Sequence, residues 1–211
     1  MRGGGYSDPV FQARSVPSSG VDSHGLSLRP YDPRDDTAVW ALHRWAIQET
    51  GVDPSDIPGT DDLRTIATSY LETGGAFVVG IVDTDHPRTD QTENFDASPQ
   101  QVAKLTTHDG ILVAMGGFIP TEVGRSDERN RPGAAELHRM RVAPTHQRRG
   151  YGRQLLNELE RRAAGGGYET LLATTSTRQT AALEFYHDQG YDQTATSTAG
   201  TYELVHFEKE L

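Results

Sequence analysis

Cysteine is absent from this sequence of 211 residues, and its absence excludes several kinds of chemistry. Disulfides, thiolate-bound zinc, iron–sulfur clusters and thiol nucleophiles all require cysteine sulfur. The eight histidines form neither an HExxH pattern nor a paired metal-ligand spacing, so we expect no metal centre. The GxSxG pattern that surrounds the nucleophile of many hydrolases is missing as well.

Long hydrophobic runs are also missing. No apolar stretch approaches the ~20 residues that a membrane-spanning helix needs, and the first residues lack the apolar segment of a signal peptide. We therefore expect a cytoplasmic protein that does not bind membranes.

Lysine is scarce, since only Lys104 and Lys209 occur and the other basic residues are arginines. Acidic residues outnumber basic residues by 30 to 20, which gives a formal net charge of −10. Nucleic acid is therefore not an expected partner, because phosphate binding needs clustered lysine and arginine. Abundant aspartate and threonine beside so little lysine fits either a high-salt cytoplasm or a GC-rich genome.

The length fits one domain. Residues 1–24 are rich in glycine, proline and serine, and we predict that they form a disordered N-terminal arm. Residues 25–211 are predicted to form the folded domain.

Periodicity predicts a mixed α/β domain with the order β-α-α-β-β-β-α-β-α-β-β. The expected strands lie near residues 26–29, 76–82, 111–119, 135–143, 170–175, 191–198 and 202–208. The expected helices lie near residues 37–50, 60–72, 149–164 and 180–189. The polar segment 84–108 is expected to be a surface excursion between two paired strands.

The informative segment is 136–156, in which a strand enters a turn with two glycines and the turn opens a helix. Free N–H groups and a partial positive charge at the start of a helix suit a diphosphate. Arg148, Arg149 and Arg153 add positive charge there. The alternative is an ordinary connection whose glycines only permit a tight turn. The phosphate-binding patterns GxxxxGK[ST] and GxGxxG are both absent.

Residues 147–152, with the sequence QRRGYG, resemble the Q/R-x-x-G-x-G/A signature of the GCN5-related N-acetyltransferases, the GNAT family. Residues 140–144 (MRVAP) are similar to that family's central strand and its exit, and residues 182–191 to its A-x-x-F-Y-x-x-x-G-F/Y segment. The resemblance covers about residues 26–208. It implies the acyl-CoA N-acyltransferase fold, a mixed and mostly antiparallel central sheet flanked by helices. It also implies an N-acetyltransferase in which an amine attacks acetyl-CoA directly, in a ternary complex.

The resemblance further implies where the co-substrate acetyl-CoA is held. Backbone N–H groups of the glycine loop bind the diphosphate, and the backbone of the central strand pairs with the pantetheine, so this strand must splay from the next one, which starts near Thr170. The residues implied in cofactor binding are Met140, Arg141, Val142, Gln147, Arg148, Arg149, Gly150, Tyr151, Gly152, Arg153 and Gln179. At Gln179 the family often has asparagine.

Acetyl transfer to an amine needs two proton movements, and each has a candidate residue. Tyr186 stands where the family often places the acid that serves the CoA sulfur, and a phenol with its ordinary pKa of about 10 stays protonated. The alternative for Tyr186 is a packed aromatic residue. Glu136, on the central strand, is the candidate base, with His138 on the same strand face as a second candidate. The alternative for Glu136 is a salt bridge with Arg139 or Arg141, in which case the amine loses its proton through water.

The acceptor is not identified by the sequence. The acidic composition mildly favours a cationic amine, of a small molecule or a protein. An acidic loop at Asp53, Asp56, Asp61 and Asp62 either attracts such an amine or is merely solvated. Thr174 stands where relatives that acetylate ribosomal N-termini often carry glutamate, which lowers the case for such a substrate.

Other readings remain open. The protein is alternatively a non-catalytic acyl-CoA-binding module of the same fold, or an interaction protein that has lost the cofactor. A homodimer is possible through the terminal hairpin. His43, His86, His108 and His206 are expected on the surface.

Overall fold

A seven-stranded sheet organises the computed structural model, which describes residues 25–48, 60–83, 97–123 and 129–211. The strand order is β1-β2-β3-β4-β5-β7-β6, and only β4 and β5 pair in parallel. The strands are β1 (Leu26–Pro30), β2 (Ala76–Val82), β3 (Ile111–Pro120), β4 (Ala134–Val142), β5 (Thr170–Ser176), β6 (Asp192–Ala199) and β7 (Tyr202–Glu210). The expected mixed, mostly antiparallel sheet is confirmed. The predicted N-terminal arm lies outside the described residues.

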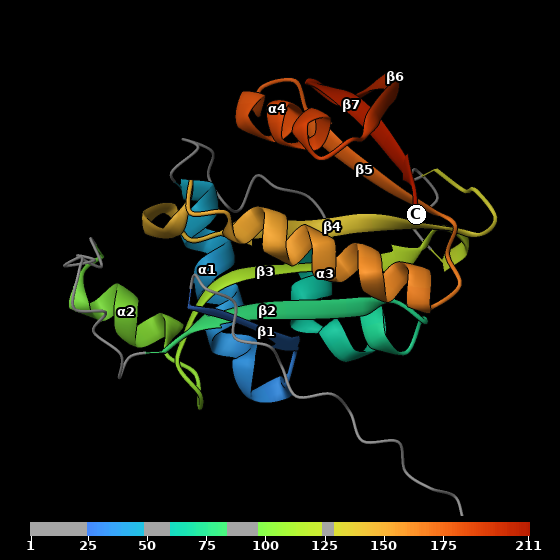
Figure 1. Ribbon diagram of the computed structural model, residues 1–211. Coiled ribbons are helices and arrows are strands. Elements are labelled where there is room, and N and C mark those ends of the chain that lie inside the picture. Colours follow the sequence, from blue (N-terminus) through green and yellow to red (C-terminus); the bar gives the residue numbers. More distant parts are fainter. Residues whose placement is uncertain (1–24, 49–59, 84–96, 124–128) are drawn as a thin grey trace, which may run out of the picture.

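Helices cover both faces of the sheet (Figure 1). They are η1 (Pro33–Asp35), α1 (Asp36–Gln48), η3 (Thr60–Arg64), η4 (Ala67–Leu71), α2 (Pro99–Leu105), η5 (Thr121–Val123), η6 (Pro144–His146), α3 (Tyr151–Gly165) and α4 (Thr180–Asp188). Helix α3 packs on β2, β3 and β4 from one side, and α1 packs on β3 and β4 from the other. Within the described residues, no helix has the length and apolar character needed to cross a bilayer.

One expectation about local structure is wrong, and another did not include a helix that the structure contains. The segment 60–72 is not one α-helix but a 3₁₀ turn followed by a short π-helix. Threonine hydroxyls compete with the helical ladder there, because Thr65 Oγ1 donates to the Asp61 carbonyl (3.2 Å) and Thr68 Oγ1 to the Thr65 carbonyl (3.1 Å). The polar excursion contains the helix α2, which Ser98 caps by accepting from the Gln101 N–H, and which buries Leu105.

The hydrophobic core has two parts, one on each side of the sheet. One lies between the sheet and the layer of α1, η3 and η4, and includes Leu42, Tyr70 and Phe77. The other lies beneath α3 and α4, and includes Leu155 and Phe207. Strand β4 runs between the two parts, so each of its side chains points toward one part or the other.

A β-bulge midway along β4 reverses the alternation of its side chains between the two faces. Met115 pairs with Arg141 and Gly117 with His138, so two residues of β4, Arg139 and Met140, lie opposite Gly116 alone. Arg139 takes the left-handed backbone conformation, with φ of +57°. A bulge shifts the alternation of side chains by one residue. Two side chains on opposite sides of the bulge therefore share a face when their residue numbers differ by an odd number.

Strands β4 and β5 separate soon after they meet. Their parallel pairing covers Ala134 to Glu136 on β4 and Thr170 to Leu172 on β5, whereas β4 continues to Val142. Figure 1 shows the two strands together near the C-terminus and diverging toward α4. The predicted splay of the central strand is confirmed.

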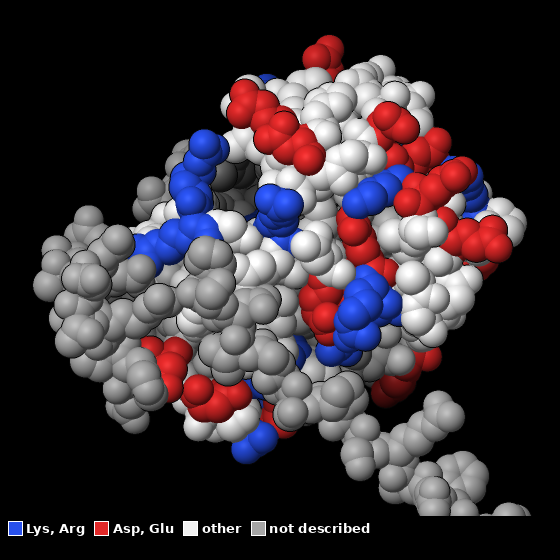
Figure 2. Space-filling view, viewed as in Figure 1, with Lys and Arg blue, Asp and Glu red and all other residues white. Residues whose placement is uncertain are grey.

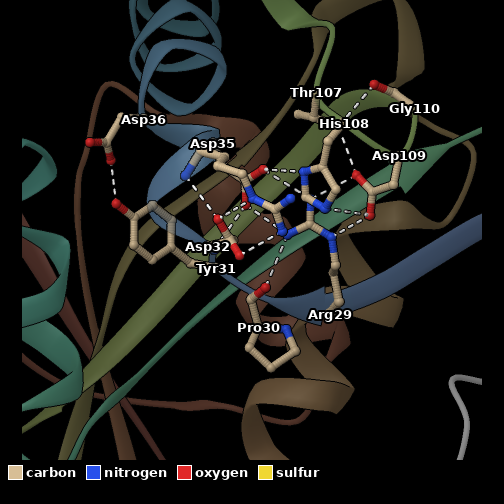
Figure 3. Close-up of polar contacts among 11 residues, drawn as sticks. Arg29, Pro30, Tyr31, Asp32, Asp35, Asp36, Thr107, His108, Asp109 and Gly110 are labelled. Carbon is tan, nitrogen blue, oxygen red and sulfur yellow. Dashed lines mark hydrogen bonds and ion pairs between the residues drawn. The ribbon is translucent and has the colours of Figure 1, made fainter.

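A partly buried ionic network links β1 to η1, the turn that leads into α1 (Figure 3). The Arg29 guanidinium forms two hydrogen bonds with Asp35 (2.7 and 2.9 Å) and two with Asp109 (2.6 and 2.8 Å). Asp35 is fully buried and also accepts from the backbone N–H of Asp32 (2.9 Å). These bonds raise the pKa of Arg29 and lower that of Asp109 to about 2. The network joins the first strand, the first helix and the turn before β3.

Candidate active site

The loop between β4 and α3 has the backbone of an anion-binding turn. Arg148 and Gly150 both adopt left-handed conformations, with φ of +62° and +83°, and Gly150 is the N-cap of α3. The first intrahelical bond is donated by the Gln154 N–H to the Gly150 carbonyl (3.0 Å). The amides of the helix before Gln154 therefore point out of its end, where they attract an anion. No protein atom lies within 4 Å of a Cβ built on Gly150, so the loop leaves open space at this point.

Basic side chains surround this end of α3. Arg148 and Arg153 are exposed and Arg149 is half-buried. The space-filling view, which has the orientation of Figure 1, shows a hollow between α4 and the beginning of α3 (Figure 2). Lys or Arg side chains lie on the rim of this hollow. Open backbone, outward N–H groups and positive charge are what a diphosphate requires, so the residues present fit coenzyme A.

The end of β4 is tied to the loop by side chains. The Met140 carbonyl accepts from Arg141 Nη1 (2.8 Å), and the Val142 carbonyl accepts from Gln147 Nε2 (3.3 Å). The Tyr151 ring is buried and stacks on His146, so only the backbone of Tyr151 is available to the loop.

Two other predicted cofactor residues, Gly152 and Gln179, lie at the start of α3 and just before α4. Gly152 has room for a methyl group at ordinary contact distances of 3.6 Å from Phe185 and 3.7 Å from Val142. Gln179 precedes α4 with an exposed side chain, and its Oε1 accepts from Thr175 Oγ1 (3.0 Å). Gly152 thus lies between the end of β4 and α4, and Gln179 lies just beyond the end of β5 that diverges from β4.

The candidate base, Glu136, lies where β4 and β5 part. Its residue is 4% exposed, and Oε1 accepts from Thr174 Oγ1 (2.6 Å). The guanidinium of Arg129 lies 3.8 Å from the same oxygen. The other oxygen, Oε2, is buried and has no hydrogen-bond partner among the described residues. The carboxylate is thus held by one oxygen, with the second available.

A chain of hydrogen bonds leads from Glu136 to the surface. The Oγ1 of Thr174 lies 3.0 Å from Nδ1 of His206, and Nε2 of His206 lies 2.7 Å from Oγ of the exposed Ser197. Because Thr174 gives its one proton to Glu136, it accepts from His206, which assigns the proton to Nδ1. Burial and the charge of Arg129 lower the pKa of His206.

Tyr186, the candidate acid, is buried on α4 beside Tyr191 and Phe207, with ring centroids 5.4 Å apart in both pairs. Burial raises its pKa to about 12, against the opposing effect of Arg141 and with a smaller contribution from Glu136. Tyr186 is therefore a packed aromatic residue whose phenol also interacts electrostatically with Arg141 and Glu136. The phenol stays protonated at any physiological pH.

A polar cluster faces the opposite side of β4 from α3. Asp62 accepts from Tyr70 Oη (2.5 Å) and pairs with Arg139 Nε (2.9 Å), and Tyr70 lies edge-on to His138. Arg139 therefore neutralises Asp62 rather than Glu136. Of the predicted acidic loop, Asp62 is thus already paired, whereas Asp53 and Asp56 lie outside the described residues.

The expectation that His43 is a surface residue is wrong. His43 is fully buried on α1, and neither ring nitrogen has a hydrogen-bond partner in the described structure. Burial, with help from Arg141, lowers its pKa to about 4. Its position four residues after Val39, on the apolar face of the helix, is the signal that would have found it. Of the others, His108 is exposed and His206 is half-buried, while His86 lies outside the described residues.

Metal ligands do not gather anywhere in the described ranges, where no three or more His, Cys, Asp or Glu residues could hold an ion. Sequence reasoning missed Tyr70 and Arg129. Nothing in the sequence points to Arg129, because it reaches Glu136 from the loop before β4.

Comparison with known proteins identifies relatives of this arrangement. A sequence model described as Acetyltransferase (GNAT) family matches residues 63–191. A search of curated proteins finds no significant match.

Solved structures of low identity share the fold. An acetyltransferase from Streptococcus agalactiae is 15% identical with a TM-score of 0.62, covering 89% of this chain and 99% of its own. The yncA protein of Salmonella typhimurium, solved with its cofactor acetyl-CoA, is 18% identical with a TM-score of 0.58, covering 88% and 94%. The ribosomal-protein-S18-alanine N-acetyltransferase of Escherichia coli is 16% identical with a TM-score of 0.56, covering 88% and 93%.

Proposed function

Because the chain belongs to the acetyltransferase (GNAT) family and is thus an acyltransferase, we propose that it moves an acetyl group from acetyl-CoA to a primary amine. The acceptor is a small molecule or a protein, and the amine attacks directly in a ternary complex. The observation that carries the proposal is the splay of β4 from β5 beside the left-handed turn at Gly150. Glu136 is the last residue of β4 that pairs with β5, so the candidate base lies where the splay begins.

The coenzyme is held by the loop and the strand that flank the splay. Backbone amides at the start of α3 receive the diphosphate, and the arginines beside them add charge. The backbone of Met140 to Val142 pairs with the pantetheine as an added strand does. When bound, acetyl-CoA supplies an activated acetyl group as a thioester. The residues that hold it are Met140, Arg141, Val142, Gln147, Arg148, Arg149, Gly150, Tyr151, Gly152, Arg153 and Gln179.

Glu136 takes the proton that the attacking ammonium must lose. Its Oε2 lacks a partner in the described residues, and Thr174 fixes the carboxylate through Oε1. Replacing Thr174 by valine should lower kcat several-fold with little change in the KM for acetyl-CoA, and Thr174→Ser should restore the rate. A valine variant as active as the wild type would exclude this role for the hydroxyl.

Tyr186 returns a proton to the leaving sulfur. The ammonium first gives one proton to Glu136, and the free amine then attacks. As the nitrogen–carbon bond forms and the carbon–sulfur bond breaks, the sulfur receives the phenolic proton, and the second proton that the nitrogen loses restores the Tyr186 phenol. Glu136 then releases its proton to the solvent. A pKa of about 12 keeps the donor protonated until that moment. The products of one turnover are therefore one acetylated amine, one free thiol and one proton.

Two further proposals concern the surroundings. We propose a cytoplasmic location. A homodimer could pair through β6, because this edge strand is exposed along its whole length. One relative is named for the ribosomal S18 alanine, but Thr174 in place of glutamate on β5 makes such a peptide terminus a poor expectation here.

The decisive experiment separates binding from turnover. Acetyl-CoA should raise the melting temperature of the wild type, and an amine panel should release free thiol. Gly150→Glu should remain folded yet lose the protection, since the carboxylate occupies the diphosphate position. Protection without thiol release from any amine would instead favour a non-catalytic acyl-CoA-binding module. Normal coenzyme binding by Gly150→Glu would refute the assigned loop.

A further inference from the structure

Among the described residues, Arg141 of β4 takes part in no ion pair. The bulge at Arg139 turns its side chain to the same sheet face as Glu136, away from the core beneath α3. In the described structure its guanidinium makes one hydrogen bond, to the neighbouring Met140 carbonyl, and no ion pair. Asp62, an acid whose charge acts on Arg141, is already paired with Arg139.

The Arg141 side chain is partly buried. Burial is the main cause that lowers its pKa, followed by the charge of Arg139, yet the residue keeps part of its surface accessible. An arginine remains charged at neutral pH even so, because its ordinary pKa exceeds 12. A poorly solvated charge of this kind is stabilised when an oxyanion with matching geometry reaches it.

His43 supplies a second polar group with nothing to bond. Its ring is fully buried, with both nitrogens unpartnered in the described residues, and it stacks on Trp40 with centroids 5.6 Å apart. Arg141 is the strongest charge that acts on it. A neutral imidazole has one N–H to donate, and leaving that donor unsatisfied costs ~1–3 kcal/mol.

We propose that Arg141 and His43 form a subsite for a carboxylate of the acceptor, so that the preferred acceptor is an amino acid or a similar compound with both an amine and an acid group. The inference rests on the proposed acetyl transfer. The carboxylate binds the guanidinium and accepts from the imidazole. The amine then faces Glu136 Oε2 and Asp62 Oδ1, two buried oxygens that lack hydrogen bonds in the described structure.

The test is a competition with matched acceptors. Acetyl-CoA is incubated with equal amounts of L-phenylalanine, L-methionine and L-glutamate, their C-terminal amides and their decarboxylated amines, and the acetylated products are counted by mass spectrometry. We expect acids to exceed their amides at least tenfold. Arg141→Met should abolish that preference, and Arg141→Lys should retain part of it. The matched control Arg161→Met changes an exposed arginine on α3 and should behave as the wild type.

Each outcome decides a different claim. Acetylated amides and amines in equal yield would overturn the carboxylate subsite and leave acetyl transfer intact. An Arg141→Met variant that loses all acceptors equally would also overturn it, because the arginine would then serve the reaction itself. If acetyl-CoA stabilises the protein but no product forms from any acceptor, the transferase proposal fails, and the subsite fails with it.

Discussion

Gly150 and Gly152 offer a pair of substitutions whose effects on stability and on coenzyme binding should differ. Gly150 has φ of +83°, where a side chain costs ~1–2 kcal/mol. A smaller gain of ~0.4–1 kcal/mol from a stiffer unfolded chain offsets part of this. Gly150→Ala should therefore destabilise the protein by about 1 kcal/mol, which lowers the melting temperature by ~2–4 °C for a domain of this size. No clash contributes, because nothing lies within 4 Å of the added carbon.

Gly152 lies inside the first turn of α3, with ordinary helical geometry. An alanine there meets Phe185 and Val142 at 3.6 and 3.7 Å, which is normal contact. Because glycine is ~1 kcal/mol less favourable than alanine within a helix, Gly152→Ala should raise the melting temperature by ~2–4 °C. The family signature accepts alanine at this position, so coenzyme binding should change less than threefold.

The coenzyme affinity of Gly150→Ala is the sharper quantity. Relief of the strained φ moves the neighbouring amides, and one lost charge-assisted hydrogen bond is worth ~1.5–3 kcal/mol, or at least tenfold in Kd. Titration calorimetry with CoA measures this, and a thermal scan without ligand measures stability. If Gly150→Ala binds CoA within threefold of the wild type, the backbone of this turn does not hold the diphosphate.

Three further predictions concern stability. His43 has a pKa of about 4 in the folded protein and 6.5 when unfolded, so it adds stability that is present above pH 6.5 and is lost as the pH falls toward 4. The free energy of unfolding should fall by ~2 kcal/mol between pH 7.5 and 5. Urea unfolding of His43→Phe should not show this fall. Tyr186 should lower stability by ~1.4 kcal/mol between pH 9 and 11, since the unfolded phenol ionises near 10 and the folded one near 12; Tyr186→Phe should remove that slope and reduce kcat. Asp35→Asn should cost ~3 kcal/mol because it leaves Arg29 half-paired in a buried site, whereas Arg34→Gln, which breaks an exposed pair, should leave the urea midpoint unchanged.

Local patterns were sufficient to predict much of the fold. The strand, glycine turn and helix around residues 135–164 form a continuous signal, and its main features depend on neighbours in the chain. The separation of β4 from β5 also followed from the family resemblance. Where hydroxyl groups compete for backbone carbonyls, as at Thr65 and Thr68, the same local reasoning predicted one regular helix and was wrong.

The environment of each candidate residue could not be predicted in the same way. Glu136 receives its hydrogen bond from Thr174 and its nearby positive charge from Arg129, and both partners arrive through strand pairing or a loop. Hydrophobic pattern specifies which face of a strand is buried, but it does not specify which polar residue of another strand lies opposite. The alternative of a salt bridge to Arg139 was reasonable by proximity in sequence, and the pairing of Arg139 with Asp62 replaces it.

The bulge in β4 also changes what the overall charge implies for the acceptor. By simple alternation, Arg141 would share a face with Leu137 beneath α3. It would lie on the face opposite Glu136, because the two residues are separated by an odd number of positions, five. The extra residue at Arg139 brings the two charges to one face, where Asp62 neutralises only one of the two arginines. Most of the excess acidic charge lies on the surface, and salt screens exposed charges beyond about 8 Å at physiological ionic strength. The acceptor therefore responds to the local surplus of positive charge at Arg141 rather than to the net charge of −10, and this is why an acidic protein can favour an acceptor that carries an acid group.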